Sequence, residues 1–168
     1  DAALGYAMQS GIPYGIGLIK NRYIARTFIQ PGQTNREEAV RIKLNVLENA
    51  VKDKKVILID DSMVRGTVSR GIIKMMKKAG AKEVHMRISA PPFTWPCFYG
   101  IDLPEKKQLT AYNHTIEEIR QQLQADSLGF FYVEDLPKII PNCKLKGHCD
   151  ACFTGNYPVP VTLKEEDQ

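Results

Sequence analysis

The order of apolar and polar positions divides the chain into alternating strands and helices. Four consecutive apolar residues at 56–59, three of them β-branched, predict a strand buried inside a parallel sheet. A helical stripe of apolar residues then runs from Ile72 to Ala79 and ends at Gly80. A second strand is predicted over Glu83–Ile88. Strand, helix and strand in this order form a βαβ unit, so we predict an α/β fold with a mainly parallel sheet.

Weaker patterns predict the flanking elements. Periodicity and punctuation by Gly, Pro and capping residues indicate helices at 1–10, 35–48, 115–124 and 136–140, and strands at 14–19 and 128–133. His85 falls on the strand at 83–88, where we expect a half-buried structural histidine. We assign no catalytic role to it or to His114.

The turn after the first strand carries the residues best suited to binding or catalysis. Asp60 and Asp61 follow the strand directly, and the loop and helix start that come next supply further candidates: Ser62, Arg65, Gly66, Thr67 and Ser69. Ligands of open α/β sheets bind beyond the carboxyl ends of the strands, and a helix N-terminus there favours a phosphate.

The acidic pair suits a different part of the same ligand. Two adjacent carboxylates can accept hydrogen bonds from sugar hydroxyls, or hold a divalent cation that binds a pyrophosphate. The run from Asp60 to Ser69 therefore predicts a ligand with a sugar, a monophosphate and a metal-bound diphosphate. An ordinary βα turn, whose acids only cap the helix, is the structural alternative.

Composition narrows the class of protein. The 168 residues are enough for one domain with a proper core, and the 43% of hydrophobic residues is ordinary for a globular protein. No apolar run approaches the roughly 20 residues that span a membrane, and no signal peptide is visible, so a cytoplasmic location is expected. The net charge of +4 fits a phosphorylated substrate, and the scattered basic residues do not form a nucleic-acid-binding pattern.

Four cysteines form the second group of candidates: Cys97, Cys143, Cys149 and Cys152. In a cytoplasmic chain, the Cys149-x-x-Cys152 spacing indicates a metal or cluster rather than a disulfide. Iron–sulfur clusters use four thiolates, and zinc accepts the same set. Thiols that are simply free or oxidised remain the alternative.

The run IDDSMVRGT at 59–67 identifies a family. Placed after an apolar strand, it resembles the PRPP-binding motif of type I phosphoribosyltransferases. Its exact sequence resembles that of the glutamine phosphoribosylpyrophosphate amidotransferases. Three further stretches agree: GIPYGIGLIKNRYIARTFIQPGQTNRE at 11–37, APPFTWPCFYGIDLP at 90–104 and CDACFTGNYP at 149–158. The resemblance covers nearly the whole chain. It departs at Val68, where the family usually carries a second hydroxyl residue.

This resemblance implies roles for particular residues. It implies a type I phosphoribosyltransferase fold with helices on both faces of the sheet. Asp60 and Asp61 would serve the ribose hydroxyls and Mg²⁺, and the loop from Ser62 to Ser69 would hold the 5-phosphate. The stretch from Lys20 to Thr34 would close over PRPP as a lid; composition alone would favour a solvated basic hairpin there. Its candidate catalytic residues are Lys20, Arg22, Tyr23 and Arg26.

The resemblance also favours one of the possible roles of the cysteines. Cys97, Cys149 and Cys152 look like three of the four ligands of a [4Fe–4S] cluster in one branch of the family, whose fourth ligand lies upstream of Asp1. Cys143 matches no family ligand, and could substitute for one or be a bystander.

The implied reaction transfers ammonia, taken from glutamine, to C1 of PRPP and releases pyrophosphate. Its product, 5-phosphoribosylamine, is that of the first committed step of purine synthesis. Purine nucleotide effectors and a homo-oligomer are implied as partners, with no nucleic acid and no membrane. Three alternatives stay open: a salvage phosphoribosyltransferase acting on a base, a PRPP-binding regulator without turnover, and a structural metal-binding module built on the cysteines.

The resemblance finally implies that the chain is a C-terminal portion of a larger enzyme. We expect residues 1–140 to form an N-terminally truncated phosphoribosyltransferase core, and residues 141–168 to form a cysteine-containing segment and tail. Residue 1 is Asp and all four cysteines lie beyond position 96, so no N-terminal cysteine can release ammonia from glutamine. We therefore expect the chain alone to be inactive with glutamine.

Overall fold

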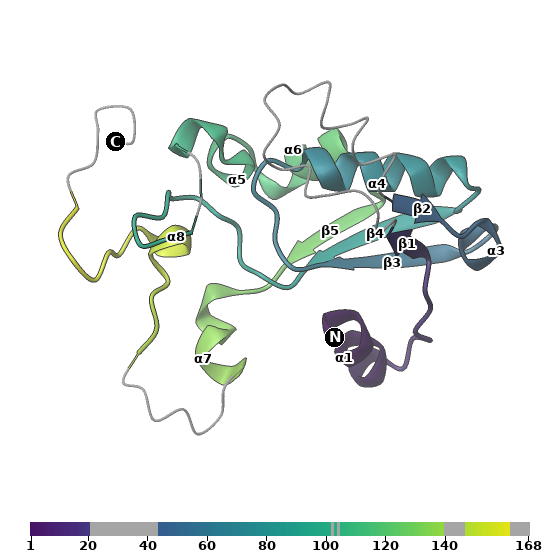
Figure 1. Ribbon diagram of the computed structural model, residues 1–168, viewed down its shortest axis with the longest axis horizontal. Coiled ribbons are helices and arrows are strands. Elements are labelled where there is room, and N and C mark those ends of the chain that lie inside the picture. The colour runs from purple at the N-terminus through teal and green to yellow at the C-terminus, as the bar shows by residue number, and fades with distance from the viewer. Residues whose placement is uncertain (21–43, 102, 104, 140–146, 162–168) are drawn as a thin grey trace.

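The computed structural model describes residues 1–20, 44–101, 103, 105–139 and 147–161. Its elements in chain order (Figure 1) are α1 (Ala2–Ser10), β1 (Leu18–Lys20), β2 (Leu44–Val46), α3 (Glu48–Val51), β3 (Lys55–Asp60), α4 (Thr67–Lys78), β4 (Glu83–Ile88), the 3-10 turn η2 (Lys106–Gln108), α5 (Thr110–Asn113), α6 (Ile116–Leu123), β5 (Ser127–Phe130), the 3-10 turn η3 (Val133–Asp135), α7 (Leu136–Ile139) and α8 (Ala151–Thr154).

A three-stranded parallel sheet forms the centre, in the order β3-β4-β5. Its register pairs Asp60 with Ile88, and Ile88 with Phe130, so the carboxyl ends of all three strands share one edge. The predicted βαβ unit is confirmed as β3-α4-β4, and with it the α/β class and the mainly parallel sheet.

Helices α4 and α6 cover one face of this sheet (Figure 1). The side chains of β4 alternate, with Val84, Met86 and Ile88 buried toward these helices and the residues between them half-buried on the other face. Ile73 of α4 and Ile119 of α6 are almost completely buried in the same cluster. The core therefore lies between one face of the sheet and two helices.

The opposite face is covered more thinly, which corrects one expectation. Of the four apolar residues at 56–59, only Leu58 is buried, whereas Val56, Ile57 and Ile59 are half-buried. Helix α1 contacts β3 from the side of the sheet opposite α4 (Figure 1), but none of its residues is buried. The long apolar run therefore indicated the strand correctly and overstated its burial.

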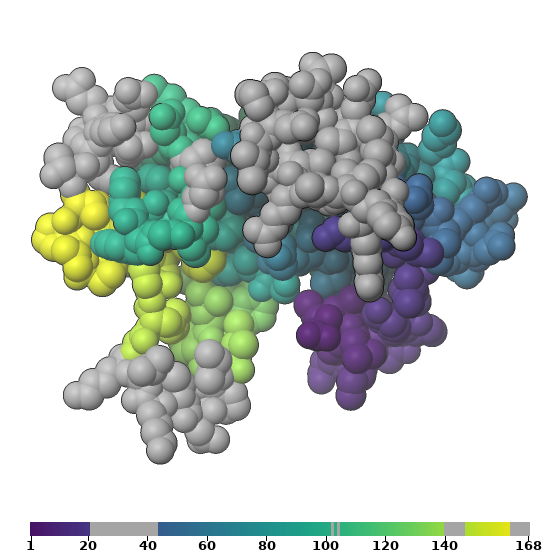
Figure 2. Space-filling view, in the orientation of Figure 1, coloured from purple at the N-terminus to yellow at the C-terminus, as the bar shows by residue number. Residues whose placement is uncertain are grey.

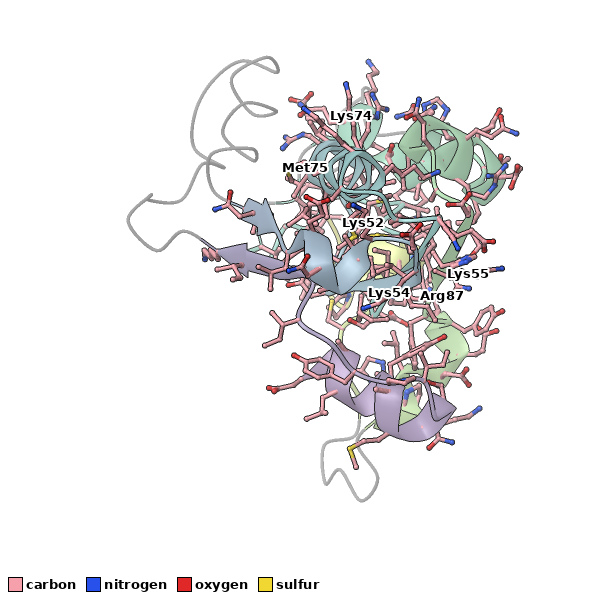
Figure 3. All side chains as sticks on the ribbon, turned by 90° about the vertical axis from the view of Figure 1, so that its right-hand side faces the viewer. Lys52, Lys54, Lys55, Lys74, Met75 and Arg87 are labelled. Carbon is pink, nitrogen blue, oxygen red and sulfur yellow. The ribbon has the colours of Figure 1, made fainter. Side chains whose placement is uncertain are left out.

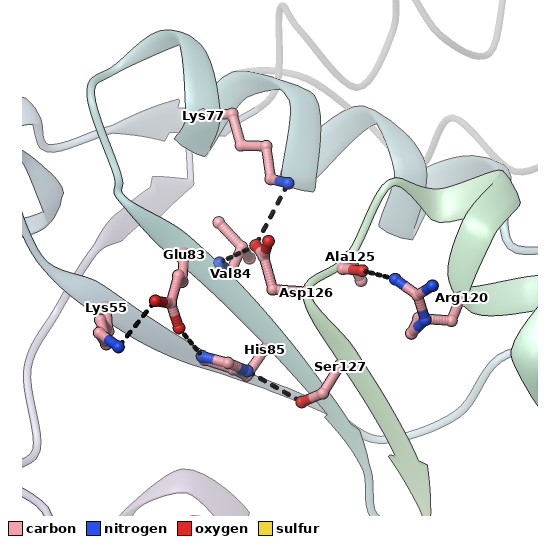
Figure 4. Close-up of polar contacts among 9 residues, drawn as sticks. All are labelled: Lys55, Lys77, Glu83, Val84, His85, Arg120, Ala125, Asp126 and Ser127. Atoms are coloured by element: carbon pink, nitrogen blue, oxygen red, sulfur yellow. Dashed lines mark hydrogen bonds and ion pairs between the residues drawn. The ribbon is translucent and has the colours of Figure 1, made fainter.

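Polar contacts hold the amino ends of the strands together (Figure 4). The two ring nitrogens of His85 lie 2.9 Å from the Ser127 hydroxyl and 2.9 Å from a Glu83 carboxylate oxygen, which gives His85 the structural role expected of it. Lys55 pairs with Glu83 at 2.7 Å, and its hydrogen bond is the main reason why the pKa of Glu83 is lowered.

Asp126 fixes the start of β5 against β4 in the same way. Its carboxylate accepts a hydrogen bond of 2.7 Å from the backbone N–H of Val84 and lies 3.2 Å from the Lys77 ammonium (Figure 4). The Val84 N–H is the largest cause of the lowered pKa of Asp126, followed, among the effects that lower it, by Lys77.

The prediction of a helix through 35–48 is wrong at its C-terminal end. Leu44–Val46 is strand β2, which pairs antiparallel with β1, and Glu48–Val51 is the separate short helix α3. Cross-strand pairing outweighs the helical periodicity at these positions. Residues 35–43 lie outside the described residues.

Two predicted strands were too long. β1 covers Leu18–Lys20 instead of 14–19, because the register with β2 begins only at Leu18. β5 ends at Phe130 instead of 133, since its pairing with β4 ends at Ile88.

The helices with clear terminal signals were predicted correctly. α6 begins after Thr115, whose hydroxyl accepts from the Glu118 N–H while the Glu118 carboxylate accepts from the Thr115 N–H, a complete capping box. α1 ends at Gly11, which has a φ of 72°. No helix in the described part of the chain is both long and apolar enough to cross a membrane.

Candidate functional site

The acidic pair stands at the shared carboxyl edge of the sheet. The backbone oxygen of Asp60 accepts two hydrogen bonds of 3.0 Å from Ser89, one from its N–H and one from its hydroxyl, so the end of β3 is tied to the end of β4. The Asp61 N–H donates to the Asp60 carboxylate at 3.0 Å, and the Ser62 hydroxyl donates to the Asp61 carboxylate at 3.0 Å. The two carboxylates are therefore held in place by neighbouring groups.

The two carboxylates differ in environment. Burial raises the pKa of Asp60, the Asp61 N–H that it accepts works in the opposite direction, and the charge of Asp61 raises it further. Asp61 is exposed. Each carboxylate accepts one of the hydrogen bonds above and has a second oxygen, and such oxygens are the ligands that a hard cation such as Mg²⁺ prefers. The pair can therefore hold Mg²⁺ or accept hydrogen bonds from sugar hydroxyls.

The loop turns into helix α4 at Gly66. This residue is the N-cap with a φ of 72°, a left-handed conformation that glycine adopts without the cost that a Cβ imposes. Glycine offers no capping side chain, and the first turn of α4 contains no acidic residue. The backbone N–H groups of this turn are therefore available to an anion, and the helix dipole favours one there.

The loop side chains divide between solvent and core. Ser62 and Thr67 are half-buried, and Arg65 is exposed. Ser69, one of the hydroxyls proposed from the sequence to contact phosphate, is only 3% exposed. Val68 packs against the main core, so its apolar side chain is explained by packing.

The lid lies mostly beyond what the structure describes. Lys20 is the exposed last residue of β1. Arg22, Tyr23 and Arg26 lie outside the described residues, and their catalytic roles stay predictions.

The cysteine region is a second site, built from two distant segments. Cys97 and Cys152 both pack against a small cluster of Phe93, Leu103 and Leu109. The N–H groups of Thr94 and Trp95 each donate to the Cys152 backbone oxygen at 3.1 Å. In Figure 2 the yellow C-terminal segment lies beside teal residues from the middle of the chain.

Two of the candidate cluster ligands lie close enough to Cys152 to affect its thiol. The pKa of Cys152 is raised to about 11, mainly by burial and then by the nearby thiols of Cys97 and Cys149. Within the described residues, however, no three His, Cys, Asp or Glu side chains are assembled closely enough to hold a metal ion. Cys143 lies outside these residues. The thiols approach one another, but their arrangement does not by itself form a metal site.

Sequence reasoning missed the partners that support the candidate phosphate loop, residues 62–66. Arg65 donates to the Gln108 side-chain oxygen at 2.7 Å, and the N–H of Thr110 donates to the backbone oxygen of Val64 at 2.9 Å. These partners lie more than forty positions away along the chain. No local pattern around Gln108 or Thr110 indicates the contact.

The far end of the sheet is chemically different. Figure 3 views the molecule from the amino ends of the strands, where Lys52 and Lys54 lie beside α3 and Lys55 lies farther from it, at the start of β3. An open hollow also lies away from the acidic pair, between β2 and the end of α4, lined by Leu44, Asn45, Val46, Met75, Lys78 and Ala79. No carboxylate is among these described lining residues, so we place the candidate site at the carboxyl edge on the chemistry of its residues.

Comparisons with known proteins agree with the geometry. The chain is 53% identical over 167 residues to an amidophosphoribosyltransferase of Bacillus subtilis, covering 96% of this chain and 34% of that protein. It is 51% identical to an amidophosphoribosyltransferase of Archaeoglobus fulgidus, covering 98% of this chain and 36% of that protein. No family model matches the chain.

Solved structures give the same result. The chain superposes with a TM-score of 0.82 and 52% identity on the glutamine PRPP amidotransferase of B. subtilis complexed with ADP and GMP, covering 96% of this chain and 36% of that one. The resemblance found in the sequence and the phosphoribosyltransferase-type α/β fold are thereby confirmed. The chain spans about a third of the length of the curated relatives that it matches.

Proposed function

We propose that this chain is the PRPP-binding part of an amidophosphoribosyltransferase, a glycosyltransferase of purine biosynthesis. The observation that carries the proposal is the acidic pair and the uncapped start of α4, which lie in succession at the carboxyl edge of the sheet. About half of the residues are identical to those of enzymes named for this activity, along nearly the whole chain.

Each part of PRPP has a matching group in this arrangement. Asp60 and Asp61 would bind the ribose hydroxyls and a Mg²⁺ ion that holds the diphosphate, which is the role that their oxygens suit. The first-turn amides of α4, with the Thr67 hydroxyl, would bind the 5-phosphate.

Little acid–base chemistry is required of the protein, because ammonia is already a nucleophile. Its attack on C1 breaks the bond to pyrophosphate, and the protein contributes by positioning the reactants and stabilising the departing negative charge. The lid candidates Lys20, Arg22, Tyr23 and Arg26 would supply that positive charge. In the complete protein, ammonia would come from glutamine.

The proposal extends to the regulation, the assembly and the cellular location of the protein. The solved B. subtilis amidotransferase is complexed with ADP and GMP, which supports purine nucleotides as effectors here. We also propose a homo-oligomer without nucleic-acid or membrane partners. Cys97, Cys149 and Cys152 are free thiols in the structure, which fits a reducing, cytoplasmic environment.

The test measures PRPP binding by calorimetry in the presence of Mg²⁺. Asp60→Asn combined with Asp61→Asn should weaken binding roughly 100-fold or more, because two charged hydrogen-bonding groups are lost. Asp53→Asn is the matched control: Asp53 is an exposed carboxylate outside the site, and asparagine tolerates its φ of 62°. Equal affinity of the double variant and the wild type would refute the site.

Turnover separates this proposal from its rivals. Pyrophosphate release from PRPP with ammonium chloride as donor, by the complete protein, would distinguish the enzyme from a PRPP-binding regulator. A salvage phosphoribosyltransferase would instead release pyrophosphate only with a purine or pyrimidine base.

A [4Fe–4S] cluster on Cys97, Cys149 and Cys152 is a further part of the proposal. The convergence of these thiols supports it, although a cluster needs a fourth thiolate and a closer arrangement than the described residues have. We derive no catalytic step from it. Iron and sulfide analysis after anaerobic purification should find the cluster in the wild type and not in Cys149→Ser, and full iron content in the variant would contradict the ligand role.

A further inference from the structure

Lys106 is a charged residue in an unusual environment. It lies in the turn η2 and is only 5% exposed. Its ammonium is 3.6 Å from the centroid of the Trp95 ring and 4.6 Å from that of Tyr112. Burying an ammonium group is costly, and contact with two aromatic faces offsets part of that cost.

The turn that carries Lys106 and the start of α5, which follows it, contact two successive residues of the candidate phosphate loop. Gln108, at the end of the turn, accepts from the Arg65 guanidinium at 2.7 Å. The N–H of Thr110 donates to the backbone oxygen of Val64 at 2.9 Å, and Val64 also packs against the cluster that contains fully buried Leu109. Val64 and Arg65 come immediately before Gly66, where the left-handed turn into α4 begins.

Trp95 anchors the other end of this arrangement. Its ring lies so close to Gly155 that a Cβ there would be 2.6 Å from a ring atom. The backbone N–H of Trp95 donates to the backbone oxygen of Cys152 at 3.1 Å. The ring is therefore packed against Gly155, and the backbone that carries it is tied to the same C-terminal segment.

We propose that Lys106 is a positioning residue for the candidate phosphate loop. Its ammonium, held by Trp95 and Tyr112, fixes η2, and η2 in turn orients Val64 and Arg65 ahead of the N-terminus of α4. The identity of the ligand that this loop binds rests on the function proposed above, whereas the positioning of the loop by Lys106 does not.

The first test needs no ligand. Hydrogen exchange at the Thr110 amide and at the amides of residues 62–66 is compared in the wild type, Lys106→Met, Lys106→Arg and Lys107→Met. Lys106→Met keeps the apolar stem and removes the charge, so it should accelerate exchange at these amides about tenfold. Lys106→Arg retains the cation and should restore slow exchange. Lys107 is the exposed neighbour in the same turn, and its variant should resemble the wild type. Unchanged exchange in Lys106→Met would overturn the proposal.

A second variant covers the case in which Lys106→Met does not fold. Gln108 is exposed, so Gln108→Leu should fold and should release Arg65. It should accelerate exchange at residues 62–66, and combining it with Lys106→Arg should add little further. Unchanged exchange in Gln108→Leu would show that η2 does not hold the loop.

The third test measures affinity for Mg²⁺–PRPP. Lys106→Met should bind roughly tenfold more weakly, with Lys106→Arg and Lys107→Met close to the wild type. An effect on thermal stability without any change in affinity or exchange would reduce Lys106 to a structural residue. If the wild type itself fails to bind PRPP, the proposed function falls, and the exchange measurements still decide the role of Lys106.

Discussion

The acidic pair of the candidate phosphate loop and the cysteine region differ in how far apart along the chain their contacting residues lie. In the loop, Asp61 donates to Asp60 and Ser62 donates to Asp61, so the contacts of the acidic pair join adjacent residues. In the cysteine region the contacts span about sixty positions. The Thr94 hydroxyl donates to the Phe153 backbone oxygen at 2.8 Å, the Tyr157 hydroxyl to that of Pro96 at 2.9 Å, and the Tyr99 hydroxyl to that of Val159 at 3.0 Å.

This difference indicates where substitutions should affect stability and where they should affect ligand binding. The acidic pair is held by adjacent residues and by the end of β3, so its carboxylates are available for a ligand. Further along, the loop contacts η2 and the start of α5. The cysteine region exists only when two distant segments dock on each other, so its small residues serve packing. We therefore expect substitutions in the cysteine region to reduce stability most, and substitutions of the loop carboxylates to affect ligand binding most.

The largest expected effect on stability is that of Gly155→Ala. The residue has a φ of 78°, and an added Cβ would lie 2.6 Å from the Trp95 ring. Overpacking and backbone strain together should cost about 2–5 kcal/mol of unfolding free energy. Denaturant unfolding followed by fluorescence measures this directly, because Trp95 is the only tryptophan in the sequence.

Gly147→Ala is the matched control for that substitution. Among the described residues, no atom lies within 4 Å of an added Cβ at Gly147, and no positive φ is recorded there, so its variant should change stability by less than about 0.5 kcal/mol. Equal effects of the two alanines would show that the docking of the two segments contributes little.

Gly66→Ala isolates backbone strain in the phosphate loop. Its φ is 72°, close to that of Gly155, but the nearest atom to an added Cβ is 3.6 Å away, an ordinary contact. The expected cost is therefore strain alone, about 1–2 kcal/mol by the same unfolding measurement. Gly66→Asn should recover part of it, because asparagine tolerates this conformation better. A cost as large as that of Gly155→Ala would contradict the distinction between the two regions.

The smallest expected effect is a gain in stability from Asp60→Asn. Burial raises the pKa of Asp60 above its usual 3.8, so the folded state binds the proton more tightly than the unfolded state does. The contribution of Asp60 to stability therefore falls as the pH rises from the pKa of the unfolded state through the higher pKa of the folded state. At neutral pH the ionised carboxylate lowers the free energy of unfolding. Asparagine removes the cost.

Unfolding midpoints at two pH values test this sign. Asp60→Asn should be slightly more stable than the wild type at neutral pH, and the gain should disappear below pH 3.8, where both states of the wild type are protonated. A loss of stability at neutral pH would mean that the carboxylate contributes to the fold, and the loop would then resemble the cysteine region.

Local patterns were sufficient for the elements that lead into and out of the candidate site. β4 was predicted over its observed bounds, Glu83–Ile88, and α6 was recognised from Thr115 and the acidic first turn that follows it. The loop after β3 was predicted to be a phosphate site because its acids, glycine and hydroxyls are contiguous, and that role stays a prediction. Periodicity, capping and turn chemistry are properties of neighbouring residues, and a sequence displays them directly.

Contacts between distant residues were not available in this way. Leu44–Val46 became a strand because β1 offered an edge to pair with, although the same residues fit a helical stripe. No sequence pattern indicated the hydrogen bond between Arg65 and Gln108 or the contact of Lys106 with the Trp95 ring. Such pairs form because folding brings particular surfaces together, and their free energy comes from burial and complementarity at those surfaces. Neither quantity exists until the chain has packed.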